Sequence, residues 1–449
     1  MRSATGQVGL HYAIVALFQL LVLQRAAATL GAGFGSFAFL LAAERVALVF
    51  CVLGMHATVM RLLAMRADEP ESTMRRRIIT RSLALRLALL LAIAAGLVAY
   101  LAADARFTTA SVWAAVALVL VMHGLMLLLA AQLQGLGRYA ALAGGSLGLL
   151  PALLWPTDDL ASLLGMIAIG YATACAAYGA VIVAACRARD NAPRNHQPRQ
   201  SLWRPLLLDG IVLSAAAALV EFSDQAGVLL LEGIVETATY NAMAFGFLIV
   251  LYPARLTAVA DAVLIPRFSA LVQQGDATAC DRAFDRAARD WRTAAGVVVG
   301  VALLGIDLVV RTWFDALPAM AAPFTAMLLV GLGGRMLLPV ARARLIATGR
   351  MPVVLLAAGA KLAADVLILL SLHHAPMTLA AALVAAWLVY EQALRCAARG
   401  RSGIDWLLIS MTIALLAVLM LSPDWTPAAG AAVTVAALAD AWLRRGMDE

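Results

Sequence analysis

The chain has 449 residues, of which 63% are hydrophobic and 14% are charged. Soluble domains are roughly 45–50% apolar and about 25% charged, so this composition excludes a soluble enzyme. Uncharged runs of about 20 residues, the length that crosses a bilayer, recur from end to end and predict an all-α polytopic membrane protein. The net charge of +7 indicates no nucleic acid here, because the basic residues lie mostly between the apolar runs.

Fourteen apolar segments predict about 14 transmembrane helices. In chain order they are residues 9–30, 37–60, 82–103, 109–134, 140–156, 161–186, 206–231, 238–263, 293–313, 321–341, 353–372, 377–394, 404–422 and 427–443. They are about twice as long as the alternating segments of a membrane β-barrel, which excludes that fold. The fifth segment is short and contains Pro151.

The basic residues predict the orientation. Lys and Arg are retained on the cytoplasmic side. Most of them fall in segments 61–81, 187–204 and 267–292 and in the other connections that the span order places on the same side of the membrane. The opposite connections hold only Arg106 and Arg311. We therefore predict a multi-pass membrane protein with both termini in the cytoplasm.

A polar, proline-containing segment divides the chain into two similar halves. We predict an N-terminal lobe of six spans (1–190), a cytoplasmic linker (191–204), a C-terminal lobe of six spans (205–398) and an extra helix pair with a cytoplasmic tail (399–449). Each lobe has a short outward turn after its first span and then a long basic inward loop. Transporters are often built from such repeats, with the substrate site between the halves.

Residues 277–291 place Cys280, Phe284 and Trp291 on one helical face with the charges elsewhere, which predicts an interfacial helix on the cytoplasmic surface. The sequence has no phosphate-binding loop, no H-E-x-x-H and no G-x-S-x-G motif, so we expect neither an enzyme nor a cofactor. The five cysteines are dispersed, and the adjacent His373 and His374 diverge on a helix or a strand, so we expect no metal site.

Charged residues inside spans face a cavity or a partner, because they are costly in hydrocarbon. Arg25 lies about 9 Å below the outer end of the first span, and Glu44 and Arg45 lie about 12 to 14 Å below that side of the second. Arg25 can pair with Glu44, which leaves Arg45 for an anion. The alternative is an ion pair that only fastens the helices.

The seventh span carries Glu221 and Asp224, and the eighth carries Arg255 near its inner end. Asp224 is either a proton or Na⁺ site or the partner of a basic residue in the other half. Arg255 either extends to the inner interface or binds an anion.

Two pairs are spaced four residues apart on one helix: Asp307 with Arg311, and Lys361 with Asp365. Such pairs neutralise themselves, so we expect them to be structural, with Lys361 as a secondary candidate because it lies near mid-membrane. Arg335 follows Gly334 and precedes Pro339, which predicts a broken helix whose exposed backbone lines a cavity.

The run Leu30-Gly31-Ala32-Gly33-Phe34-Gly35-Ser36-Phe37-Ala38 resembles the LGxxxFGxFA signature of the polysaccharide transporters in the multidrug/oligosaccharidyl-lipid/polysaccharide exporter superfamily. Residues 222–225, 240–242 and 266–269 of the second half are similar to this family as well, and the resemblance covers about residues 9 to 400. One departure is Gln225, which stands where many relatives carry a basic residue.

The resemblance implies two six-helix lobes in a V shape that alternate between inward-open and outward-open states. It implies an undecaprenyl-diphosphate-linked glycan as substrate, moved across the bacterial inner membrane for lipopolysaccharide O-antigen or exopolysaccharide. The polysaccharide polymerase machinery is a further candidate partner. The candidate diphosphate-binding residues are Arg25, Arg45, Arg255 and Arg335. The candidate ion-coupling or charge-pair residues are Glu44, Glu221, Asp224, Lys361 and Asp365.

Two functions remain open. The first is a flippase or exporter of a lipid-linked oligosaccharide, and the alternative is an H⁺- or Na⁺-coupled exporter of small, often cationic compounds. A net positive cavity favours the first, because the guanidinium fork matches phosphate oxygens. Unpaired carboxylates favour the second. A membrane glycosyltransferase is disfavoured, because the outward loops are only about ten residues long.

Overall fold

The computed structural model describes residues 2–52, 59, 63, 72–187, 203–254, 257–399, 406–422 and 426–448. All regular elements in this part of the chain are helices. They are α1 (Arg2–Leu30), η1 (Gly31–Gly33), α2 (Phe34–Val52), α4 (Ser72–Ala103), α5 (Ala110–Gly135), α6 (Tyr139–Ser146), η2 (Leu147–Leu154), α7 (Leu160–Arg187), α8 (Trp203–Leu231), α9 (Thr237–Ala254), α10 (Thr257–Gln273), α11 (Ala277–Trp313), α12 (Ala321–Ala347), α13 (Met351–Leu372), α14 (Pro376–Arg399), α15 (Trp406–Leu421) and α16 (Thr426–Asp448).

The predicted all-α membrane fold is confirmed. Nine helical stretches among the described residues are long and apolar enough to cross a bilayer, and three further apolar helices are shorter. The short ones are Tyr139–Leu154, Leu408–Leu421 and Thr426–Ala439. The first of these is the predicted fifth span, in which α6 tightens into the 3₁₀ helix η2 around Pro151. The predicted count of 14 therefore stays a prediction.

Two predictions about single helices are wrong. Residues 277–291 are not a separate interfacial helix, because they form the first part of the continuous, 37-residue α11. Their apolar face is buried against protein, with Phe284 next to Phe268 of α10 and Arg344 of α12. The span around Arg335 is not broken either, since α12 continues through Pro339 to Ala347.

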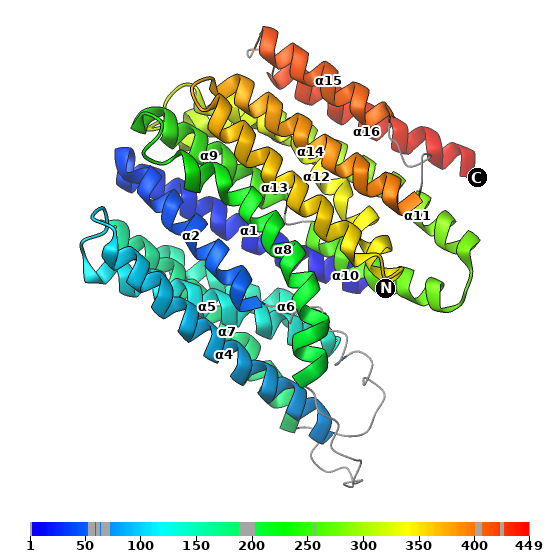
Figure 1. The fold of residues 1–449 in the computed structure, drawn as a ribbon, viewed down its shortest axis with the longest axis horizontal. Helices are drawn as coiled ribbons and strands as arrows, with labels where there is room; N and C mark the ends of the chain where they lie inside the picture. Colours follow the sequence, from blue (N-terminus) through cyan, green and yellow to red (C-terminus); the bar gives the residue numbers. More distant parts are fainter. Residues whose placement is uncertain are drawn as a thin grey trace. The chain divides into compact units, whose positions relative to one another are not determined.

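The chain forms two compact units. Unit 1 comprises Met1–Leu30 and Leu40–Glu221, and unit 2 comprises Gly31–Phe39 and Phe222–Glu449. The helices of each unit run side by side as a bundle (Figure 1). The lobe boundaries predicted from the sequence stay a prediction.

In unit 1, α5 lies between α4 and α7, and α1 packs on α6 and η2. In unit 2, α12 is buried along nearly its whole length and packs on α9, α10, α11 and α14. The Gly31–Phe39 segment packs on α9, where the Asn241 side-chain amide donates a hydrogen bond to the Ala32 carbonyl oxygen at 3.1 Å. A Cβ atom at Gly35 would lie 2.6 Å from side-chain atoms of Tyr240 and Asn241, so this close approach requires glycine. The signature run and residues 240–242 thus meet in space.

The longest helix of unit 2, α11, lies against α16 through glycines. A Cβ atom at Gly430 of α16 would lie 2.5 Å from the Leu304 backbone nitrogen and 2.7 Å from the Gly300 carbonyl oxygen. Small residues allow such close packing of helix backbones within membranes.

Candidate functional site

A cluster of charged side chains lies inside unit 2, where three helices meet. It consists of Ser223 and Asp224 on α8, Arg335 on α12, and Lys361 and Asp365 on α13. We call these five residues the unit 2 charge cluster. Lys361 is 4% exposed and Asp365 is 1% exposed, so the charges are withdrawn from solvent and lipid alike. Buried charges persist in proteins only when they are paired and hydrogen-bonded.

Lys361 is the hub of this cluster. Its Nζ lies 2.7 Å from Oδ2 of Asp365 and 3.7 Å from Oδ1 of Asp224, and it donates a hydrogen bond to Oγ of Ser223. The Ser223 hydroxyl in turn donates to Oδ2 of Asp365. The predicted Lys361–Asp365 pair is confirmed, and the structure adds two partners from α8.

Arg335 pairs with the other oxygen of Asp224. Its Nη2 donates to Oδ2 of Asp224, and its guanidinium lies 4.7 Å from the ring centroid of Trp387 on α14. A guanidinium over an indole face gains a further electrostatic attraction. The two carboxylates of the cluster are therefore matched by two cations, and Asp224 takes a basic partner within its own unit rather than from the other half of the chain.

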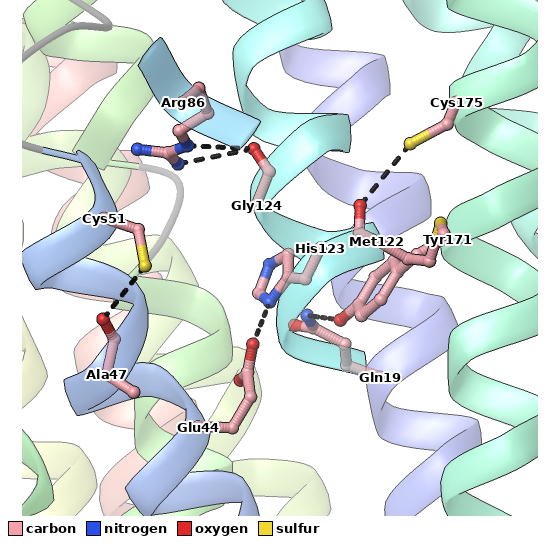
Figure 2. A network of polar contacts seen from close by, with 10 residues as sticks. All are labelled: Gln19, Glu44, Ala47, Cys51, Arg86, Met122, His123, Gly124, Tyr171 and Cys175. Carbon is pink, nitrogen blue, oxygen red and sulfur yellow. Dashed lines mark hydrogen bonds and ion pairs between the residues drawn. The ribbon is translucent and has the colours of Figure 1, made fainter. Parts of the chain in front are cut away.

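Unit 1 holds a second polar network, on α1, α2, α5 and α7. The Glu44 carboxylate lies 2.9 Å from Nδ1 of His123, and the His123 ring stacks on Tyr171 with ring centroids 4.4 Å apart. The Tyr171 hydroxyl accepts a hydrogen bond from Gln19 at 3.2 Å. Figure 2 shows Glu44 and His123 pointing toward each other across the α2–α5 contact. The partner of Glu44 is thus the imidazole of His123, which the sequence analysis did not predict.

Arg25 does not meet Glu44. Its Nη1 donates to the carbonyl oxygen of Leu153 in η2. Arg45, beside Glu44 on α2, is buried at 7% exposure. Arg25 and Glu44 therefore do not form the predicted ion pair between the first two helices. Each residue has a different partner.

Arg86 on α4 is fully buried, and sequence reasoning did not select it. Its Nε and Nη2 both lie 3.3 Å from the Gly124 carbonyl oxygen (Figure 2). Nη1 has no hydrogen-bond partner among the described residues. A backbone carbonyl accepts hydrogen bonds but carries no net charge, so the Gly124 carbonyl does not neutralise the charge of the Arg86 guanidinium.

Arg255, Glu221 and the Asp307–Arg311 pair are the other charged residues that the sequence analysis selected. Arg255 lies outside the described residues. Glu221 is half-buried on α8, at the last residue of unit 1. The predicted Asp307–Arg311 pair is confirmed at 2.9 Å, with side chains 38% and 75% exposed.

Further ion pairs join neighbouring helices of unit 2. Arg342 of α12 pairs with Asp261 of α10, Arg344 of α12 pairs with Asp281 of α11, and Arg399 of α14 pairs with Asp285 of α11. Asp281 and Asp285 are one turn apart on the segment that was predicted to lie on the membrane surface. The carboxylates of Asp281 and Asp285 form ion pairs with arginines of α12 and α14, which explains why this segment packs against protein.

An ion pair in the connecting loop between α4 and α5 joins Asp104 and Arg106. The side chain of Arg106 donates to both carboxylate oxygens of Asp104, at 2.9 and 3.1 Å from Nε. These hydrogen bonds lower the pKa of Asp104 to about 2. Arg106 and Asp104 thus both stay charged near neutral pH and cancel locally.

No family model matches the sequence, and no curated protein matches it. Solved structures do match over nearly the whole chain. A MOP superfamily transporter from Pyrococcus furiosus Vc1 (DSM3638) is 13% identical with a TM-score of 0.63, over 92% of this chain and 95% of that one. The lipid II flippase MurJ, in an inward closed conformation, is 12% identical with a TM-score of 0.55, over 98% and 100%. The eukaryotic MATE transporter AtDTX14 is 12% identical with a TM-score of 0.54, over 97% of each chain. The chain has the fold that these transporters share.

Proposed function

We propose that this protein is a transporter that moves a lipid-linked oligosaccharide, carried on undecaprenyl diphosphate, across the bacterial inner membrane by alternating access. The fold supports the transporter class, because its solved neighbours are MATE transporters and the MurJ flippase. The lipid-linked substrate and the destination in O-antigen or exopolysaccharide synthesis are part of the proposal. The polysaccharide polymerase machinery is the partner that would receive such a glycan.

The observation that carries the proposal is the balance of charges inside the bundles. In unit 2, Asp224 and Asp365 each face a cation, and in unit 1 Glu44 faces His123. Arg25 and Arg86 instead donate to backbone carbonyl oxygens. This leaves positive rather than negative charge available, and a diphosphate is the group whose oxygens match a guanidinium fork.

Arg25 is the residue most suited to contact the diphosphate. Arg25 is half-buried, and its side chain donates to the carbonyl oxygen of Leu153, which a phosphate oxygen can replace with a gain in electrostatic energy. Arg45 and Arg255 are proposed as further contacts, on the grounds given by the sequence. Arg335 has a weaker claim, because its charge is already matched by Asp224.

The alternative function is an H⁺- or Na⁺-coupled exporter of small cationic compounds. The MATE neighbours favour it, and so does the presence of buried carboxylates at Glu44 and Asp224. An exporter of cations needs a carboxylate that is free to meet its substrate, however, and both of these have basic partners within their own unit.

Ligand binding to the purified, full-length protein tests the choice. Geranylgeranyl diphosphate, a short prenyl diphosphate, should raise the melting temperature, because a ligand that binds only the folded state stabilises it. Tetraphenylphosphonium, a lipophilic cation, should have no such effect. Arg25→Ala should abolish the shift with the diphosphate, and Arg311→Ala, which removes an exposed arginine, should keep it. Stabilisation by the cation alone would reject the proposal in favour of the exporter.

A further inference from the structure

The surroundings of Lys361 are those of a bound cation. Its ammonium faces oxygen atoms from three side chains, namely Ser223, Asp224 and Asp365, and lies 5.8 Å from the ring centroid of Trp387. Oxygen ligands around a cation, with carboxylates among them, are the environment that proteins build for hard metal ions. The aromatic face on one side adds a surface that attracts a cation of any kind.

The carboxylates have more acceptor capacity than the lysine uses. Oδ1 of Asp224 and Oδ1 of Asp365 are both buried, and neither has a hydrogen-bond partner among the residues that the structure describes. Ser223 cannot supply the missing donors, because its hydroxyl already donates to Oδ2 of Asp365. Buried acceptors are normally satisfied, so two orphaned carboxylate oxygens beside one ammonium need an explanation. A cation with several coordination positions would satisfy them better than one ammonium group on a tether.

Lys361 is also the only lysine among the 34 basic residues of the chain. An arginine would place a planar fork here, whereas lysine places a compact point charge at the end of a flexible stem. The position therefore holds the side chain that most resembles a small monovalent cation in charge and size.

We infer that Lys361 is a tethered cation that fills a monovalent-cation site built by Ser223, Asp224 and Asp365. In the native chain the ammonium keeps this site closed to dissolved cations. If the ammonium is removed, the same oxygen atoms bind Na⁺ or a small alkylammonium ion. The inference rests on the contacts within unit 2 and does not depend on what the protein transports.

The test uses the full-length protein purified in detergent, with thermal unfolding measured in NaCl and in choline chloride of equal concentration. The native protein should give the same melting temperature in both salts. Lys361→Ala should be less stable in choline, and Na⁺ or methylammonium should raise its melting temperature in a saturable manner. Lys361→Met, which keeps an apolar stem of similar length, should respond to Na⁺ in the same direction.

Two control variants separate this site from general salt effects. Arg311→Ala also removes the cation from a pair with an aspartate four residues away, but at an exposed position, and it should show no difference between the salts. Lys361→Ala with Asp365→Asn should lose the response to Na⁺, because a carboxylate ligand is gone.

Three outcomes would overturn the inference. The first is a folded Lys361→Ala or Lys361→Met protein whose stability ignores Na⁺ and methylammonium. The second is a native protein that is itself stabilised by Na⁺ over choline as strongly as the variants. The third is that neither variant can be purified in any of these salts, because the lysine would then be a structural partner that no dissolved cation can replace.

Discussion

The contact between His123 and Glu44 joins two buried side chains on neighbouring helices of unit 1. Both side chains are at most 5% exposed, and the carboxylate lies 2.9 Å from Nδ1. Removing one member of a buried pair leaves the other uncompensated, which costs about 3–5 kcal/mol. We predict that His123→Ala lowers the free energy of unfolding by an amount of this order, measured on the purified protein. His374→Ala, in an exposed turn, is the control and should be near neutral.

Arg25 and Glu44 have separate partners, so we expect no direct interaction between these two side chains. Because Arg25 donates to Leu153 and Glu44 meets His123, exchanging the two charges should not restore a working arrangement. We predict that the double variant Arg25→Glu with Glu44→Arg is at least as impaired in folding yield and transport as the worse single variant. Recovery of either property in the double variant would mean that the two residues interact directly.

Ion pairs whose two residues share a helix could be predicted from the sequence. The pairs Asp307–Arg311 and Lys361–Asp365 follow from helical spacing alone, and both are present. The pair Asp224–Arg335 joins residues 111 positions apart, and no pattern in a single sequence specifies which helices touch. The same holds for His123: a lone histidine in an apolar run gives no signal of the carboxylate on the neighbouring helix.

At the scale of helices, the contact between α11 and α16 depends on the absence of side chains. Gly430 faces backbone atoms of α11, which cannot move aside as a flexible side chain can. We predict that Gly430→Ala destabilises the packing of α16 on α11 and lowers the melting temperature. The matched control is Gly305→Ala on α11, where an added Cβ would meet nothing within 4 Å. It should be neutral or stabilising by up to about 1 kcal/mol, because alanine favours helix more than glycine does. Equal effects of the two substitutions would contradict this packing.

Most helices could be predicted from hydropathy, because apolar runs of bilayer length allow few other structures. The two wrong predictions have a common cause. Amphipathic spacing in residues 277–291 and a proline at 339 describe only local preferences. Neighbouring helices decide the outcome, since α10, α12 and α14 supply the partners of the first segment. In α12, packing against other helices on nearly all sides supports a helix that continues through its proline.

For the whole molecule, the predicted orientation can be tested residue by residue. The two basic residues on the predicted outward side, Arg106 and Arg311, each pair with a nearby aspartate. Their charges are thus neutralised, in agreement with the rule that free positive charge stays in the cytoplasm.

We predict that single cysteines at Asp158 and His374 react with an impermeant maleimide in intact cells, after the five native cysteines are replaced by alanine. Single cysteines at Gln274 and Thr348 should react only after the membrane is opened. The reverse pattern would invert the topology.

Translocation of a lipid-linked oligosaccharide by the purified protein can be measured in reconstituted vesicles. The probe is undecaprenyl diphosphate carrying a short oligosaccharide, and the readout is the fraction that becomes accessible on the opposite leaflet. We predict translocation by the native protein, a loss of at least about tenfold in Arg25→Ala, and partial recovery in Arg25→Lys, because a point charge lacks the bidentate geometry. Arg311→Ala should translocate as well as the native protein. Ion-driven efflux of a cationic dye that survives Arg25→Ala, with no movement of the lipid-linked probe, would contradict the proposed function.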